Sequence, residues 1–173
     1  SLMADMEGSV WVGTGADGLH RLRDGKFTLL GQPEGFTVNP IWSILQDKRG
    51  DVWVATAGGG VLQLRDKKVI ATYTTKNGFP SDRPRPMAEA PDGTLWIGTL
   101  GQGLVAMNNG KTITYTAEKD GLLANGINTL FFDKDGALWM NHQGAGITVM
   151  KNGKVQKTLT IANGLKTNFA PSF

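Results

Sequence analysis

The sequence predicts an all-β fold, namely a β-propeller or an open arc of one, made of four-stranded antiparallel blades. Three observations support this prediction: a tandem repeat of about 43 residues, short strand-like segments within each repeat, and 24 glycines among 173 residues. Because units of this length are too small to bury a core alone, we expect neighbouring units to stack and share one.

Tryptophan marks the repeat. Four of the five tryptophans recur at spacings of 42, 43 and 43 residues, and a glycine stands seven residues after each. These positions are Trp11, Trp53, Trp96 and Trp139, with Gly18, Gly60, Gly103 and Gly146. A further glycine set is followed four residues later by Asn39, Asp82, Asn125 and Asn168. The pattern predicts one propeller segment over residues 1–173, with repeats at about 1–40, 41–83, 84–126 and 127–173.

Within a repeat, every segment has the character of a strand. In the second repeat, residues 41–46, 52–56, 61–65 and 69–74 are short runs rich in β-branched and aromatic residues, bounded by Gly, Asp and Asn. No run shows the apolar period of a helix. Four strands of about five residues with tight turns account for the length of the repeat.

The second of these strands is apolar on both faces. Val52 and Val54 lie on one face and Trp53 and Ala55 on the other, because side chains alternate along a strand. We therefore expect the strand to be covered on both sides, with the tryptophans in a structural role. The small residue two positions after each Trp is expected to leave room for the indole; Asn141 departs from this rule in the fourth repeat.

Composition and charge argue against several classes of partner. The 18 basic and 15 acidic residues give a net charge of +3 and are spread along the chain. Because there is no long basic run, no nucleic-acid partner is expected. No stretch approaches the roughly 18 consecutive apolar residues that would span a membrane, so this segment is expected to make no membrane contact.

Neither a metal nor a cofactor is predicted. The chain has no cysteine, which excludes disulfides and thiolate metal sites. Asp133, Asp135 and Gly136 resemble the start of a calcium-binding loop, but the third oxygen position and the distal Glu are lacking. Turn chemistry is the better interpretation of this motif.

The third repeat carries a recognisable motif. Residues 92–99 read Asp-Gly-Thr-Leu-Trp-Ile-Gly-Thr, followed by Gly-Leu at 103–104 and Gly-Lys at 110–111. In this motif, which recurs in register in all four repeats, the sequence resembles the two-component regulator propeller family. Repeat two departs from it at Ala55 and Lys67, and repeat four at Asn141 and His142.

The resemblance implies the extracytoplasmic, periplasmic sensor region of a bacterial histidine kinase, hybrid regulator or diguanylate cyclase, with no catalysis in this segment. Since such proteins usually carry more repeats, we expect an excised arc. Open blade faces and strand edges in an arc predict self-association.

Positions that differ between repeats are the candidates for ligand binding, because invariant positions serve the blade. Those near the turns between second and third strands, and near the start of the first strand, are Trp42, Arg83, Arg85, Asn128, Asp17, Gln102, His142 and Gln143. Trp42 suits stacking on a sugar, or else fills the core between blades. Arg83 and Arg85 are held extended by Pro84 and Pro86 and could grip an anion, or else lie in a solvated loop.

Three functions remain open. The first is a non-catalytic ligand sensor for a small polar molecule such as an oligosaccharide, and the second is a structural or protein-interaction platform. The third is an enzyme similar to streptogramin lyases, which share a related propeller and use His with Glu. His20 and His142 occupy non-equivalent positions of different repeats, and no triad is assembled by spacing, which argues against the third.

Overall fold

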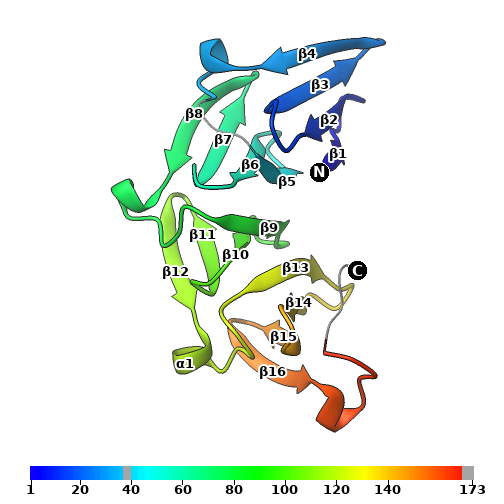
Figure 1. The fold of residues 1–173 in the computed structure, drawn as a ribbon, viewed down its shortest axis with the longest axis vertical. Helices are drawn as coiled ribbons and strands as arrows, with labels where there is room; N and C mark the ends of the chain where they lie inside the picture. The colour runs from blue at the N-terminus through cyan, green and yellow to red at the C-terminus, as the bar shows by residue number, and fades with distance from the viewer. Residues whose placement is uncertain (37–39, 169–173) are drawn as a thin grey trace. The chain divides into compact units, whose positions relative to one another are not determined.

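The computed structural model describes residues 1–36 and 40–168. In these ranges, sixteen strands form four sheets, each of four antiparallel strands in chain order, so that each sheet is a meander (Figure 1). Each predicted repeat contains one sheet, called a blade below, and the all-β fold class is thereby confirmed. Asn39 lies outside the described residues. The chain divides into two compact units, Ser1–Pro84 and Arg85–Phe173.

The first unit holds blades 1 and 2. Blade 1 consists of β1 (Leu2–Ala4), β2 (Val10–Gly13), β3 (Leu19–Arg23) and β4 (Lys26–Leu30). Blade 2 consists of β5 (Ile41–Gln46), β6 (Val52–Thr56), β7 (Val61–Arg65) and β8 (Lys68–Tyr73). A single 3₁₀ turn follows the fourth strand of each blade, η1 (Gln32–Glu34) and η2 (Thr75–Asn77).

The second unit holds blades 3 and 4. Blade 3 consists of β9 (Pro84–Glu89), which begins at the unit boundary, β10 (Leu95–Thr99), β11 (Leu104–Asn108) and β12 (Lys111–Tyr115). Blade 4 consists of β13 (Ile127–Phe132), β14 (Leu138–His142), β15 (Gly146–Lys151) and β16 (Lys154–Leu159). Short helical turns follow again, α1 (Ala117–Asp120) and η3 (Ile161–Asn163). Among the described residues, no helix has the length and apolar character needed to cross a membrane.

Neighbouring blades of one unit share a core. The indole of Trp11 on β2 joins Val52 and Val54 of β6, together with Ile41 and Ile44 of β5, in one buried cluster. In the second unit, the cluster that includes Trp96 on β10 contains Leu138 and Met140 of β14 and Ile127 of β13. The tryptophan face of one blade therefore packs on the branched or aliphatic face of the next, which buries surface that one sheet could not bury alone.

The coverage of the second strand differs between blades. In β6 every residue is buried, as expected for a strand covered on both faces. In β2, by contrast, Val10 is 37% exposed, while Trp11 on the opposite face is buried. The expectation of double coverage is thus wrong for blade 1, because only its tryptophan face packs on blade 2.

The glycine two positions after Trp makes room for the next blade. A Cβ added at Gly13 would lie 2.5 Å from Cγ2 of Ile41, and one added at Gly98 would lie 2.8 Å from Cγ2 of Ile127. These isoleucines open the first strands of the following blades. The expectation that this space serves the indole is corrected: it admits the neighbouring blade's isoleucine.

An aspartate six residues before the tryptophan anchors the indole, a feature that the sequence analysis missed. The Trp Nε1 donates a hydrogen bond to Oδ2 of Asp5 in blade 1 (2.8 Å), Asp47 in blade 2 (2.9 Å) and Asp133 in blade 4 (2.7 Å). Oδ1 of Asp133 accepts from the backbone N–H of residues 135 and 137. Since both oxygens of Asp133 are engaged, turn chemistry accounts for the calcium-like motif. Ala90 takes this place in blade 3.

The helical turns depend on the recurring Asn or Asp. Oδ1 of Asp82 accepts from the N–H of residue 75, Oδ1 of Asn125 from that of residue 117, and Oδ1 of Asn168 from that of residue 161. Each acceptor thus satisfies an N–H at the start of a helical turn, which would otherwise lack a partner. The side chain folds the connection between blades back onto the preceding blade.

The glycine seven residues after Trp is required by both conformation and space. Gly60, Gly103 and Gly146 have φ of 74°, 83° and 112°. A Cβ at any of them would collide with a backbone carbonyl of the fourth strand, that of Tyr73, Tyr115 or Leu159. We predict that Gly103→Ala lowers the free energy of unfolding by roughly 1–3 kcal/mol, measured by urea denaturation.

Gly101, in the same turn, provides the control. No atom lies within 4 Å of a Cβ built there. Gly101→Ala is therefore expected to change the free energy of unfolding by no more than about 0.5 kcal/mol. Equal losses in the two variants would contradict the steric account.

Candidate functional site

The strand registers gather the predicted ligand residues at one end of each blade. Ile41 pairs with Thr56 and Val61 pairs with Tyr73. The start of the first strand, the turn between second and third strands, and the end of the fourth strand therefore lie at the same end, called the upper end below. The turns between first and second strands and between third and fourth strands form the lower end.

Trp42 lies at a β-bulge at the upper end of blade 2. The register passes from Ile41–Thr56 directly to Ser43–Ala55, so Trp42 is the extra residue of the bulge. Bulges of this kind turn a side chain away from its regular direction. Trp42 is 46% exposed, against 3% for Trp11, so the alternative that it fills the core between blades is wrong.

Asn128 occupies the same structural position in blade 4. The register passes from Ile127–His142 to Thr129–Asn141, and Asn128 is the extra residue. Its side chain is half-buried. Trp42 and Asn128, which occupy equivalent positions in the aligned repeats, are thus both bulge residues.

Asp17 and Gln102 lie in turns built on a threonine hydroxyl. The hydroxyl of Thr14 donates to the carbonyl of Gly18 (3.0 Å) and accepts from the N–H of Asp17 (2.8 Å). The Thr99 hydroxyl does the same with Gly103 (2.8 Å) and Gln102 (2.8 Å). Since backbone groups hold the turn, the exposed side chains of Asp17 and Gln102 are available to a ligand.

His142 replaces this threonine in blade 4. Its ring is fully buried, and Nε2 lies 2.8 Å from the hydroxyl of Thr148, which also accepts from the N–H of Leu123. Burial lowers the pKa of His142, against a smaller raising effect from the carbonyls of Ala124 and Gly126. These contacts favour a structural role for His142; a ligand contact stays a prediction.

The remaining candidates lie close to this region in sequence. Gln143 is exposed, and its N–H donates to the carbonyl of Gly126. Arg83 is exposed in the first unit, with its N–H donating to the Ser81 hydroxyl at 3.1 Å. Arg85 is half-buried in β9 of the second unit, in the extended conformation that the flanking prolines predict.

The structure gathers the candidates into two groups, one in each unit. In the first unit, Thr14 links two of them, since it contacts Asp17 and its carbonyl accepts from the N–H of Ile41, the neighbour of Trp42 (2.9 Å). In the second unit, the N–H of Gly103 donates to the carbonyl of Asn125 (2.9 Å). This contact brings the Gln102 turn close to the segment that leads into β13. The second group contains Gln102, Asn128, His142 and Gln143.

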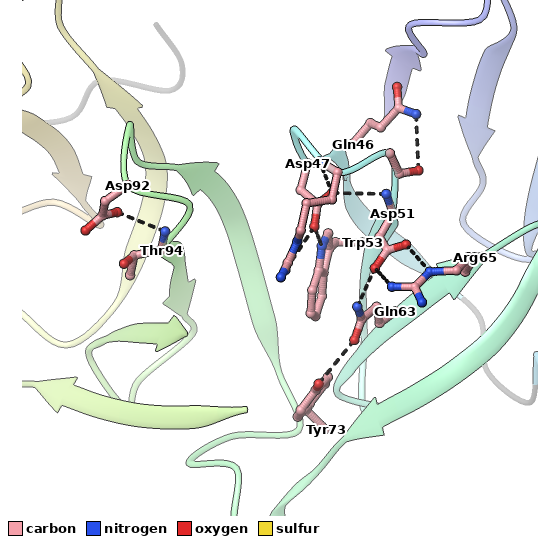
Figure 2. A network of polar contacts seen from close by, with 11 residues as sticks. Gln46, Asp47, Asp51, Trp53, Gln63, Arg65, Tyr73, Asp92 and Thr94 are labelled. Carbon is pink, nitrogen blue, oxygen red and sulfur yellow. Dashed lines mark hydrogen bonds and ion pairs between the residues drawn. The ribbon is translucent and has the colours of Figure 1, made fainter. Parts of the chain in front are cut away.

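A polar network at the lower end of blade 2 was not foreseen. Figure 2 shows Arg65 and Gln63 converging on the carboxylate of Asp51, which is 1% exposed. Arg65 donates through Nε and Nη2 at 2.8 Å each, and Gln63 donates at 2.6 Å while accepting from Tyr73. The hydrogen bonds from Arg65 outweigh burial and hold the pKa of Asp51 below its ordinary value.

The signal for this network was present in the repeats. Asp51 stands where the other blades have Ser9, Thr94 and Ala137. An internal comparison restricted to the lower-end turns would have identified Asp51 as a departure.

A comparison with known families identifies the repeat. Residues 35–58 match the two component regulator propeller family. This segment is therefore similar to a two component regulator propeller repeat. It contains the bulge at Trp42 and the anchored indole of Trp53. Because the other blades reproduce the landmarks of this regulator propeller repeat at a period of 42 or 43 residues, the resemblance inferred from sequence is confirmed.

Solved structures share the fold. The extracellular domain of a hybrid two component system from B. thetaiotaomicron matches 99% of this chain with a TM-score of 0.83 and 22% identity, over 23% of its own length. A second such domain from the same organism matches 91% of the chain with a TM-score of 0.74 and 18% identity, also over 23% of its length.

The fold of the chain is also similar to that of an enzyme. Virginiamycin B lyase from Staphylococcus aureus matches 91% of the chain with a TM-score of 0.69 and 20% identity, over 53% of its own length. The chain thus spans about a quarter of the two extracellular domains and about half of the lyase. At these identities the likeness shows the fold. No curated protein matches the chain in sequence.

The buried His142 predicts a pH dependence of stability. The folded state favours the neutral imidazole, whereas the unfolded chain takes up a proton near the ordinary pKa of about 6.5. Wild-type stability should therefore be constant at higher pH and fall as the pH drops below about 6.5, by at most about 1.4 kcal/mol per pH unit. Urea denaturation between pH 8 and pH 5 measures this slope.

His142→Thr supplies the comparison, since threonine is the residue at this position in the other three blades. The variant lacks the ionisable group, so its stability should fall less steeply over the same range. Parallel curves for the wild type and the variant would refute the assignment of this pH dependence to His142.

Proposed function

We propose that the chain is part of the extracytoplasmic sensor region of a bacterial two-component signalling protein, and that it binds a small polar ligand without catalysing a reaction. Two findings support the sensor assignment: the regulator propeller repeat at residues 35–58, and the fold shared with extracellular domains of hybrid two component systems. A kinase or cyclase output domain outside these 173 residues belongs to the same proposal.

The exposed indole of Trp42 is the observation that carries ligand binding. A bulge removes it from the ladder and leaves it 46% exposed at the upper end of blade 2. Covering an exposed indole with the apolar face of a ligand lowers the free energy, because apolar surface is removed from water. The flat ring suits the C–H face of a sugar. The exposed carboxylate of Asp17, in the turn that Thr14 links to the start of β5, is available to pair with hydroxyl groups.

A protein-interaction platform is the second candidate. On β4, the fourth strand of blade 1, Phe27 is 66% exposed and Leu29 is 54% exposed. Apolar side chains along an edge strand favour contact with another chain. Self-association of copies through such edges is part of this alternative.

A lyase activity has less support. The likeness to virginiamycin B lyase is one of fold, at 20% identity. His142, one of the two histidines, is fully buried against Thr148, so a substrate at the surface would not reach its ring without rearrangement. These two points support the non-catalytic proposal.

We predict that neutral oligosaccharides that bind the chain change its tryptophan fluorescence through Trp42. The screen uses tetrasaccharides of glucose, xylose and mannose, followed by fluorescence and thermal unfolding. A ligand present at a hundredfold excess over its dissociation constant should stabilise the wild type by about 2.7 kcal/mol. Trp42→Ala should lose the response.

Phe27→Ala is the matched control, because it removes an exposed aromatic ring from β4, away from the upper end of blade 2. This variant should respond as the wild type does. A ligand that stabilises Trp42→Ala equally would remove Trp42 from the site. A response to no member of the panel, combined with a concentration-dependent dimer lost in Phe27→Ala, would favour the interaction platform instead.

A further inference from the structure

A polar cleft lies at the lower end of the first unit, between blades 1 and 2. Its volume is about 640 Å³, within the range of small-molecule sites. Blade 1 contributes residues of β2, β3 and the turn before β2, and blade 2 contributes both of its lower-end turns. None of the eight predicted ligand residues lines it.

Blade 2 departs from the repeat where it lines this cleft. Arg49 stands where the other blades have the acids Glu7, Asp92 and Asp135. Lys67 stands where the other blades have Gly25, Gly110 and Gly153. Both departures introduce a cation, and both residues line the same cleft.

Lys67 holds a backbone conformation that suits glycine. Its φ is 67°, close to the 71°, 76° and 71° of the glycines at this position in blades 1, 3 and 4. A residue with a Cβ is strained there, and strain of this kind accumulates at functional positions. The turn itself gains nothing from the lysine, so its side chain is the feature to explain.

The charges of the cleft are only partly balanced. Five basic residues line it against four acidic ones, and the basic set is Arg21, Arg23, Arg49, Arg65 and Lys67. Arg65 is satisfied by Asp51 at 2.8 Å. Arg49 lies 3.4 Å from Oδ2 of Asp47, an oxygen that already accepts a hydrogen bond from Trp53. Lys67 has no ion pair in the described part of the chain.

Arg21 adds a buried donor to the lining. It is 7% exposed and lies over the Trp11 ring, with Nη2 near Asp5 (3.5 Å) and Glu7 (3.2 Å). Among the described residues, its Nε has no hydrogen-bond partner. Asp5, Glu7 and the Trp11 ring thus hold the Arg21 guanidinium in the wall of the cleft.

A cavity of about 500 Å³ in the second unit partly corresponds to this cleft, although residues of blade 3 alone line it. Its lining includes Trp96, Ala106 and Asn108, which correspond to Trp11, Arg21 and Arg23 of the first cleft. Two cations of the first cleft are thus replaced by uncharged residues in blade 3.

We propose that the cleft between blades 1 and 2 binds a small molecule through an oxyanion group: a carboxylate, a sulfate or a phosphate. Arg49 and Lys67 supply the charge, and Arg23 adds to it. Arginine and lysine are the side chains best suited to these groups. The site is separate from Trp42 and does not depend on the function proposed above.

Calorimetric titration of the whole 173-residue chain at low salt tests the proposal, with sulfate, phosphate and glucuronate as probes and glucose as the neutral control. We expect saturable binding of at least one anion and none of glucose. Binding of sulfate and phosphate would show that an oxyanion group is sufficient for binding. Binding of glucuronate alone would show that the cleft also contacts the attached sugar ring. Both outcomes support the site.

Two variants replace the departures of blade 2 with residues found at the same positions in other blades. Arg49→Asp and Lys67→Gly should each weaken anion binding by about tenfold or more, because each removes a charge-assisted contact. Lys67→Gly should also raise the thermal midpoint, since glycine relieves the strained φ. A loss of binding in a more stable variant would not be explained by misfolding.

Lys134→Asp and Lys68→Ala are the controls. Lys134 lies in the corresponding turn of blade 4, and Lys68 is the neighbour of Lys67 outside the cleft lining. Both, and Trp42→Ala, should bind the anion as the wild type does. The proposal is overturned if no anion saturates, if glucose binds as well as glucuronate, or if Arg49→Asp and Lys67→Gly bind unchanged.

Discussion

The packing of one blade's tryptophan face on the next blade's second strand is the constraint on which each unit depends. It places Trp11 against Val52 and Val54, and it requires a glycine at position 13 so that Ile41 fits. A four-stranded sheet of this size exposes two apolar faces and has no interior of its own. Stacking therefore supplies the core, and the conserved spacing of Trp and Gly within this chain follows from that need.

The turns at the ends of the blades are held by hydrogen bonds between the backbone and one threonine or aspartate side chain, which leaves the other side chains of the turn available for function. At the upper end of blades 1 and 3, a threonine hydroxyl and a glycine of positive φ hold the turn. The side chain of the residue before that glycine, Asp17 or Gln102, is therefore not needed to form the turn. At the lower end, an aspartate caps the turn and anchors the indole in three of the four blades. A scaffold of this kind holds exposed residues in place while it tolerates their replacement.

The departures of blade 2 from the repeat have a common physical character. Asp51 is a buried acid whose charge is stabilised by Arg65. Lys67 has a positive φ, which strains the backbone of its turn. Each residue places a charge in the lining of one cleft. The strained backbone of Lys67 costs stability, so its position in this cleft is more readily explained by a ligand than by the fold.

The sequence by itself determined the period, the four strands of each blade and the turn glycines, because these depend on alternation and local backbone geometry over a few residues. The set of variable upper-end residues also followed from it. Only the tertiary structure decided that Trp42 is exposed at a bulge, that His142 is buried against Thr148, and that Arg21 of blade 1 and Lys67 of blade 2 line one cleft. Strand register and contacts between repeats decide these features, and neither can be obtained from a linear pattern.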